Sequence, residues 1–508
     1  FSANQETTSV LSYFKTATNY DLYTNNLWIN QRIINHHAYL VKPNKMFTNW
    51  GDGNNLLFNP MSLYFISYYG TNNYNEYANW VIANRQSYFE KGYRWYNRIW
   101  EIIWFEEQDS RRTFNDLPLD WYSSNVGTLV SRSSWDDSNA VHLTFSNNKH
   151  QRSGHLHRDA NSFSLYHKGE LIVDSGYYDG YGSNYYNNYY SRTIAHNTIT
   201  VFDPNEIFYY EGIPQNESND GGQIRLARMF TYDHLVNDPS HLIGSIPKYE
   251  ANNNYMYVVS NATKSYNPNK VSEFTREMLY IKPDKIAIFD RVNSLNPTFK
   301  KSFLLHFQNE PNINGNIVNT EVASHIVSYD GNTITATEGQ GGVTAITILP
   351  EQHTIRKVGG SGYEYYVNGV NYPTLPNPWA PNEFRPGNWR TELSPTLNNN
   401  FDNFFNIIIT SDSINPPGIN YQLLRNDDKI VARSEDDIFA FSKYGTNVNQ
   451  LSFNVMYTGN ANFFLADMQP SRLYNVNING NPSSFTSSSQ GVLYFTAMLT
   501  GNNVISIN

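Results

Sequence analysis

One stretch decides how this chain folds: Ser153-Gly-His-Leu-His-Arg-Asp-Ala-Asn-Ser-Phe163. It is followed by Leu171-Ile-Val-Asp-Ser-Gly176 and by Arg192-Thr-Ile-Ala-His-Asn-Thr198. Apolar and β-branched residues surround the polar ones, which predicts short buried strands joined by loops. His155 and His157 are two positions apart, so on an extended segment their side chains project from the same face.

The same stretch gathers side chains that bind metals. His155, His157 and His196 are accompanied by one carboxylate, Asp174, which follows an apolar strand. If the segments converge, two histidines and the aspartate form a good ligand set for zinc, and the third histidine is free for chemistry beside it. A buried, hydrogen-bonded cluster without metal uses the same residue types, and this alternative stays open from the residues alone.

Around this stretch the chain changes character twice. Residues 1–115 carry apolar side chains at three-to-four spacing, which predicts helices. Residues 116–412 consist of short alternating runs such as Lys285–Asp290, which predict a large antiparallel β-sandwich, and residues 413–508 predict a smaller all-β domain. We therefore expect a multidomain α+β chain. Its candidate helices are Ser9–Ala17, Met61–Tyr69, Tyr77–Ala83 and Arg98–Phe105.

The composition restricts the possible partners. A net charge of −9 disfavours nucleic acid, which requires a basic surface, and no apolar run is long enough to span a membrane. The absence of cysteine leaves histidine and carboxylates as metal ligands. A local basic cluster that would suit an acidic substrate falls within ten residues: Lys149, His150, Arg152, His155, His157 and Arg158. The 39 tyrosines suit a sugar-binding surface and a β-rich core equally, so they decide neither.

The order of the domains and several motifs resemble the heparinase II/III-like polysaccharide lyases, from about residue 10 to about residue 310. In that family, an (α/α) toroid packs against a β-sandwich and an acidic polysaccharide lies in the cleft between them. The enzymes cleave at a uronate by β-elimination. The motifs are His155-x-His157-x-Asp159-x-Asn161-Ser-Phe163, Asp174-Ser-Gly176, Tyr189-Tyr-Ser-Arg192, Ala195-His196-Asn-Thr198, Leu117-Pro-Leu-Asp-Trp121 and Trp50-Gly-Asp52.

The resemblance implies a metal site within the sandwich. His157, Asp174 and His196 would hold a zinc ion with a structural role, which fixes the wall of the cleft. Asp159 and Asn161 are expected to form hydrogen bonds within turns and strands rather than to bind the ion. The remaining histidines are expected to be ordinary hydrogen-bonded residues. These are His142, His150, His167, His306 and His325.

The resemblance also implies catalytic residues. His155 would contact the uronate or remove its C5 proton, and Arg192 would meet a carboxylate with its planar guanidinium group. Tyr189 would lie at the active cleft. Because the surrounding loop is rich in tyrosine, Tyr185, Tyr186 and Tyr190 remain alternatives for this role.

The family's toroid is longer than residues 1–115, and it contributes an Asn or His and a catalytic Tyr. We align residues 9–52 with the later part of the toroid, so we expect the remaining toroid portion, with its Tyr, upstream of Phe1. An alternative register uses Asn35-His36-His37 and Tyr93 for these roles. It is disfavoured because too few residues separate Tyr93 from His155 for the intervening helices.

The leading prediction is a polysaccharide lyase acting on a uronate-containing glycan such as a glycosaminoglycan or alginate. A uronate C5-epimerase uses the same proton abstraction, and a non-catalytic glycan-binding relative would keep only the zinc site and the sandwich. The chain begins at Phe1 rather than Met, as a processed product does, so we expect a protein secreted by a bacterium or held in its periplasm.

Overall fold

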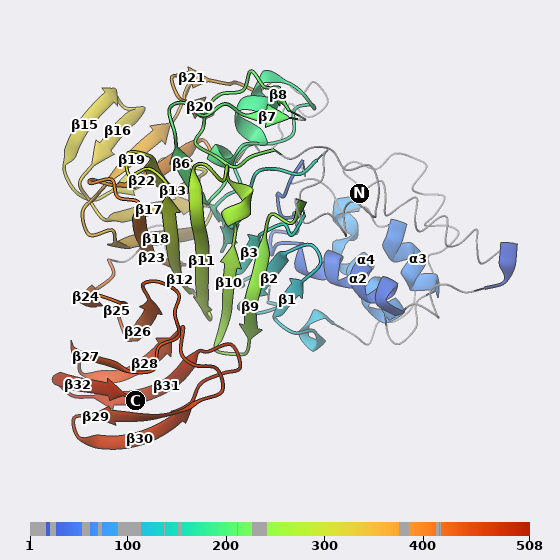
Figure 1. The fold of residues 1–508 in the computed structure, drawn as a ribbon. Helices are drawn as coiled ribbons and strands as arrows, with labels where there is room; N and C mark the ends of the chain where they lie inside the picture. The colour runs from blue at the N-terminus through green and yellow to red at the C-terminus, as the bar shows by residue number, and fades with distance from the viewer. Residues whose placement is uncertain are drawn as a thin grey trace.

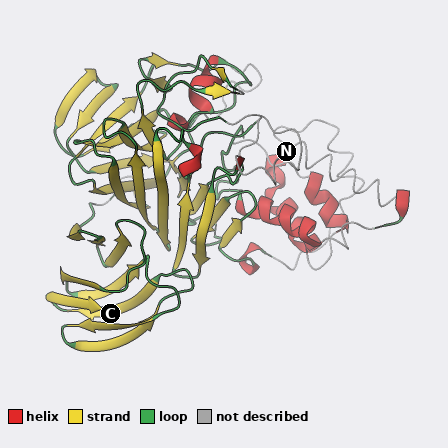
Figure 2. Cartoon of the chain, in the orientation of Figure 1, coloured by secondary structure: helices red, strands yellow, loops and turns green. Residues whose placement is uncertain are grey.

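The computed structural model describes most of the chain, with gaps concentrated before residue 113. The described residues are 17–20, 27–52, 61–69, 74–89, 113–136, 138–150, 155–210, 212–225, 241–374, 386–412, 416 and 418–508. Helices come first and strands follow (Figures 1 and 2). The helix expected at Arg98–Phe105 lies outside the described residues, as does nearly all of the one expected at Ser9–Ala17.

Three helices form a small helical part: α2 (Leu27–Tyr39), α3 (Met61–Tyr69) and α4 (Tyr74–Phe89). α3 has the bounds that the apolar spacing predicts, and α4 contains the predicted segment Tyr77–Ala83. Their buried side chains share one cluster with Phe114 and Val130, which belong to the segment that follows. The helices therefore pack on one another and complete their core against the first β-sheet.

The first sheet is an antiparallel meander of five strands in sequence order. It lies between the helices and the larger sheets (Figure 1). Its side chains hold the end of α2: the Nη1 of Arg132 donates to the Val41 carbonyl (3.0 Å), and Trp121 stacks on Tyr39. A 3₁₀ turn, η1 (Phe114–Asp116), precedes it. The strands are β1 (Asp120–Ser123), β2 (Thr128–Arg132), β3 (His142–Ser146), β4 (Ser162–Tyr166) and β5 (Glu170–Ile172).

Two large antiparallel sheets form the sandwich. The eight-stranded sheet has the order β14-β17-β18-β23-β12-β11-β10-β9, and the six-stranded sheet has the order β15-β16-β19-β22-β13-β6. Their facing side chains, such as Phe274 of the eight-stranded sheet and Phe303 of the six-stranded sheet, share one core. The first, five-stranded sheet adds Leu143 and Phe163 to it. The segment that carries the histidines thus sits on a rigid, fully packed support.

The bounds of the eight strands are β9 (Ser245–Ala251), β10 (Tyr255–Asn261), β11 (Val271–Ile281), β12 (Lys285–Ser294), β14 (Asn312–Ile313), β17 (Thr333–Glu338), β18 (Gly341–Leu349) and β23 (Phe401–Ser411). Those of the six are β6 (Ile199–Phe202), β13 (Lys300–Phe307), β15 (Ile317–Val322), β16 (Ile326–Tyr329), β19 (His353–Gly359) and β22 (Trp389–Pro395). Short elements connect them: η2 (Tyr186–Tyr190), η3 (Thr193–Ala195), η5 (Thr263–Ser265), and the hairpins β7 (Tyr209–Tyr210) with β8 (Ile213–Pro214) and β20 (Tyr366–Val367) with β21 (Val370–Asn371).

The C-terminal part contains a five-stranded and a four-stranded sheet around its own core. The alternate side chains of β12 explain how it attaches. Ile286 and Ile288 face the sandwich core, whereas Ala287 and Phe289 face strands of the C-terminal part. The strands are β24 (Tyr421–Asn426), β25 (Lys429–Ser434), β26 (Asp437–Ser442), β27 (Leu451–Met456), β28 (Gly459–Leu465), β29 (Leu473–Ile478), β30 (Asn481–Thr486), β31 (Leu493–Leu499) and β32 (Asn502–Ile507).

The predicted fold class is confirmed: the chain is mostly β, with several antiparallel sheets and few helices. The proposed domain limits at residues 115 and 412 stay predictions. None of the helices in the described part of the chain combines the length and the apolar character needed to cross a membrane.

Candidate functional site

The site is built from the loop that leads into β4 of the first sheet and from the segment that connects β5 to β6 of the six-stranded sheet. Residues 155–161 lead into β4, Asp174 follows β5, and His196 follows η3. Asn197 joins these loops, because its side-chain amide donates to the carbonyl oxygens of Phe163 (2.8 Å) and Val173 (2.7 Å). Buried donors that are paired in this way fix the loops relative to each other.

His157, Asp174 and His196 come together as the sequence predicts. One ligand atom from each residue lies within 4.8 Å of those of the other two. The Nδ1 of His157 and the Nε2 of His196 are buried, and neither has a hydrogen-bond partner among the described residues. Two unpartnered imidazole nitrogens beside a carboxylate are a donor set that suits zinc, so these residues fit the ion that the sequence predicts.

The second nitrogen of His196, Nδ1, is hydrogen-bonded to the carboxylate of Asp174. Burial by itself lowers the pKa of His196, but the adjacent Asp174 outweighs burial and raises it. Asp159 has the hydrogen-bonding role expected for it, because it accepts from the side chain of Asn148 at 3.1 Å. Burial raises the pKa of Asp159.

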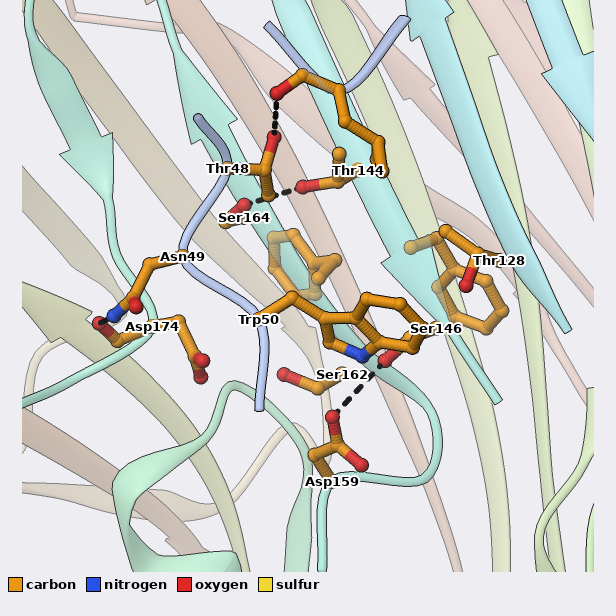
Figure 3. A pocket seen from close by; sticks show the side chains of 13 residues that line it. Thr48, Asn49, Trp50, Thr128, Thr144, Ser146, Asp159, Ser162, Ser164 and Asp174 are labelled. Atoms are coloured by element: carbon orange, nitrogen blue, oxygen red, sulfur yellow. Dashed lines mark hydrogen bonds between the residues drawn. The ribbon is translucent and has the colours of Figure 1, made fainter. Parts of the chain in front are cut away.

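A loop of the helical part closes over this cluster. The side-chain amide of Asn49 donates to the carbonyl oxygens of Asp174 (3.1 Å) and Gly176 (3.2 Å). Figure 3 shows Asn49 and Trp50 lying against side chains of the first sheet, with Asp159 and Asp174 beside them. The cavity between them has a volume of about 30 Å³. A single water needs roughly 10–15 Å³, so this cavity accommodates water and excludes a sugar.

The carboxylate of Asp52 contacts both histidines of the His-x-His motif. Its Oδ2 lies 2.5 Å from the Nδ1 of His155, and its Oδ1 lies 2.9 Å from the Nε2 of His157. The hydroxyl of Tyr186 also donates to Oδ2, at 3.4 Å. The sequence pointed to Asp52 only as part of the Trp50-Gly-Asp motif, because no local pattern reveals a partner 103 residues away.

His155 is the predicted site residue that faces solvent. Its side chain is 74% exposed, whereas those of His157 and His196 are fully buried. The half-buried Tyr178 lies edge-on to it, with 6.1 Å between the ring centroids. His155 is therefore placed to meet a ligand, and the buried histidines are placed to hold an ion.

The geometry does not support the catalytic roles predicted for Tyr189 and Arg192. Both side chains are fully buried. Tyr189 shares a hydrogen bond with the hydroxyl of Ser175 at 2.8 Å, and burial raises its pKa. Arg192 is paired with the carboxylates of Glu217 and Asp220. Because these partners already occupy its guanidinium group, Arg192 is not free to meet a substrate carboxylate.

The alternative tyrosines of the same loop, Tyr185, Tyr186 and Tyr190, are buried as well. Sequence reasoning missed the exposed residues instead. Tyr181 is 56% exposed, and its hydroxyl accepts a hydrogen bond from Arg225 at 3.0 Å. Only the density of tyrosine and glycine in residues 177–190 hinted at such a surface.

The other histidines behave as expected. His142, His306 and His325 each place a ring nitrogen against a backbone carbonyl oxygen, at 2.7 to 3.0 Å. His167 contacts the carboxylate of Asp412. These contacts account for four of the five histidines that the sequence analysis set aside.

Comparison with known proteins agrees with this architecture. A family model described as "Heparinase II/III-like, C-terminal" matches residues 124–414, and no curated protein matches. The heparan sulfate lyase HepC from Pedobacter heparinus is structurally similar, with 14% identity, a TM-score of 0.51, and 85% of this chain and 56% of HepC covered. A mutant of HepC is similar with 14% identity and a TM-score of 0.50, and the match covers 83% of this chain and 54% of the mutant. This chain thus spans little more than half the length of HepC, and at such identity the likeness shows a shared fold.

Proposed function

Because this chain belongs to the heparinase II/III-like family, we propose that it is a polysaccharide lyase that cleaves a uronate-containing acidic glycan by β-elimination. The observation that carries the proposal is the exposed His155, which is held by a carboxylate directly beside the buried cluster of His157, Asp174 and His196. The glycan would lie between the helical part and the sandwich. An extracellular glycan of this class fits a bacterial protein that is secreted or periplasmic.

His155 would remove the C5 proton of the uronate. Asp52 accepts a hydrogen bond from Nδ1, so Nε2 is the nitrogen that remains for the substrate. The electrons released at C5 form the double bond to C4, and the bond between C4 and the glycosidic oxygen breaks. The leaving oxygen takes a proton from an acid.

Tyr178 is a candidate for this acid. It lies beside His155, and its hydroxyl carries a proton at neutral pH because an ordinary tyrosine titrates only near pH 10. Burial, together with the charge of Asp52, raises its pKa further. A tyrosine of a toroid portion preceding Phe1, as the resemblance implies, is the alternative. Loss of turnover in Tyr178→Phe would favour the first of these.

The zinc ion belongs to the proposal as a structural element. His157, Asp174 and His196 would hold it, and when bound it would fix the segment that carries His155. Arg225, which donates to the exposed Tyr181, is a candidate cation for a substrate carboxylate in place of Arg192: its side chain is 23% exposed, and its Nη1 lies 3.9 Å from Glu217.

The test is an ultraviolet assay for unsaturated uronate, carried out with glycosaminoglycans and alginate as substrates. We expect His155→Ala to lower kcat by about 10²–10⁴-fold, the usual contribution of a general base. Its melting temperature should stay unchanged because the side chain is exposed. His325→Ala, a half-exposed histidine in another part of the sandwich, is the matched control and should keep full activity.

The same assay separates two other functions. Incorporation of solvent deuterium at C5 without ultraviolet absorbance would show a uronate C5-epimerase. Binding of the glycans without either signal would show a non-catalytic glycan-binding protein, a function that the burial of Tyr189 and Arg192 favours. Either result would overturn the lyase proposal.

A further inference from the structure

We infer that Asp52 is a positioning residue that serves both halves of the site at once, by holding the metal-facing His157 with one carboxylate oxygen and the substrate-facing His155 with the other. This inference rests on the proposed function for the role of His155. The arrangement of the three side chains stands independently of it.

Each oxygen of the Asp52 carboxylate contacts a different histidine. Oδ1 is 2.9 Å from the Nε2 of His157, and Oδ2 is 2.5 Å from the Nδ1 of His155. The side chain of Asp52 is 5% exposed, and that of His157 is fully buried. An ionised carboxylate only accepts hydrogen bonds, so both imidazoles must donate to it.

This requirement fixes the protons on both rings. In its neutral form, His157 carries its proton on Nε2, which leaves the lone pair of Nδ1 for the ion that it would hold with Asp174 and His196. Within the described part of the chain, that buried nitrogen has no hydrogen-bond partner. His155 carries its proton on Nδ1, which leaves Nε2 as the basic atom. Metal-binding histidines commonly have their second nitrogen held by a carboxylate in this way.

The backbone around Asp52 holds the carboxylate in place. Gly51 adopts a φ of +56°, and a Cβ atom there would lie 2.5 Å from the carbonyl oxygen of His155, so only glycine fits. The same oxygen accepts from the backbone N–H of Asp52 at 3.2 Å. The hydroxyl of Tyr190 donates to the Gly51 carbonyl oxygen at 3.0 Å. Both polar groups of the peptide between Gly51 and Asp52 are therefore hydrogen-bonded, which holds Asp52 in position.

The spacing of the two histidines completes the argument. His155 and His157 lie two residues apart in the loop that leads into β4, and both of their rings are within hydrogen-bond distance of the single carboxylate of Asp52. An amide has one acceptor oxygen and one donor nitrogen, so asparagine at position 52 can accept a hydrogen bond from only one ring, and the other ring would have to change its tautomer to stay bonded. Asp52→Asn thus separates the positioning role from the shape of the side chain.

The first measurement uses the unsubstituted full chain loaded with zinc. Long-range ¹H–¹⁵N spectra of its histidines should show His155 protonated at Nδ1 and His157 protonated at Nε2, assigned with the variants His155→Ala and His157→Ala. The opposite tautomer on either ring would overturn the inference. This test does not depend on the folding of any Asp52 variant.

The second measurement compares Asp52→Asn with Asp116→Asn, an exposed aspartate of the residues that precede the first sheet, which loses the same charge. Competition with a chelator should show 10–100-fold weaker zinc binding for Asp52→Asn, the usual effect of losing such a partner. Its kcat should fall with little change in KM, whereas Asp116→Asn should match the unsubstituted protein. Unchanged zinc affinity in Asp52→Asn would contradict the inference.

The two proposals fail separately. If the unsubstituted chain cleaves none of the glycans but shows the expected tautomers and the loss of zinc affinity in Asp52→Asn, the lyase proposal falls and the positioning role of Asp52 stands. If the chain is an active lyase and Asp52→Asn keeps its zinc affinity and its kcat, the positioning role falls alone.

Discussion

At the scale of single residues, the cluster of His157, Asp174 and His196 was predictable because these residue types are themselves typical metal ligands. Two histidines and an aspartate on segments expected to converge suit a metal ion or a buried hydrogen-bonded cluster, and the structure brings them together. The roles of Tyr189 and Arg192 were not predictable in this way. Whether an arginine meets a ligand or a buried carboxylate depends on Glu217 and Asp220, which lie on a later loop.

Replacement of Asp174 by alanine should remove the metal and lower stability together. Asp174 supplies one ligand and is the hydrogen-bond partner of the buried His196. Breaking a buried charged pair costs about 3–5 kcal/mol, so we expect a loss of this size in the free energy of unfolding. Elemental analysis and urea unfolding measure the two effects. An Asp174→Ala protein that retains its full metal content would show that the ion binds elsewhere.

Arg192 has a structural role that substitution can reveal. Arg192→Met should lower the free energy of unfolding by about 3–5 kcal/mol, because it leaves Glu217 and Asp220 buried beside an apolar side chain. The KM of the folded fraction should change little, since the guanidinium group does not reach the surface. Urea unfolding and steady-state kinetics check this expectation. A large rise in KM at unchanged stability would restore the catalytic role predicted from the sequence.

At the scale of elements, periodicity predicted α3 at its observed bounds, since apolar residues at three-to-four spacing have few alternatives. Strand ends were harder to predict. The run Lys285–Asp290 predicted a strand, but β12 continues to Ser294 because Asp290 and Arg291 are buried in ion pairs with residues of the neighbouring strand β11. From the sequence alone, a charged residue suggests that a strand ends, because the ion-pair partner that would let it be buried is not visible.

Strands β19 and β22 carry a pH-dependent contact, because Arg356 and Glu392 face each other across them. Burial opposes ionisation of Glu392, but Arg356 and Arg390 outweigh it and hold the pKa of that carboxyl well below its usual range. A depressed pKa stabilises the fold above the unfolded-state value of about 4.3. This stabilisation is lost as the pH falls toward the folded-state pKa.

We therefore expect the free energy of unfolding to decrease as the pH falls below about 5. Glu392→Gln should be less stable at pH 7 and should depend less on pH over this range. Glu321→Gln, which removes a more exposed partner of Arg356, is the control and should have a smaller effect. Urea unfolding at several pH values measures both. Parallel curves for Glu392→Gln and the unsubstituted protein would contradict the assignment.

At the scale of the whole molecule, the order of helices, sandwich and C-terminal β part could be predicted, but the way the parts are joined could not. Arg291 of β12 pairs with Glu277 of the same sheet and with Asp467 of the C-terminal part. It also donates to the carbonyl oxygen of Ser442 at 2.6 Å. No sequence pattern links residues so far apart.

Arg291→Met should weaken the attachment of the C-terminal part. It leaves Glu277 buried without its cation and Asp467 with only Lys248, 3.7 Å away, and loss of such a buried partner costs about 3–5 kcal/mol. In calorimetry, we expect the C-terminal part to unfold at a lower temperature than the sandwich. Adding Asp467→Asn should recover part of the loss. A single transition at the original temperature in Arg291→Met would show that apolar contacts alone hold the two parts together.

The loop of residues 48–52 has a consequence for the thermodynamics of the whole chain. It reaches from the helical part to the metal cluster through Asn49 and Asp52. Linkage is reciprocal, so if zinc binding favours the docked loop, docking of the helical part must raise the affinity for zinc by the same factor. Occupancy of the zinc site and docking of the helical part, which would close the proposed substrate cleft, would then be governed by the same equilibrium.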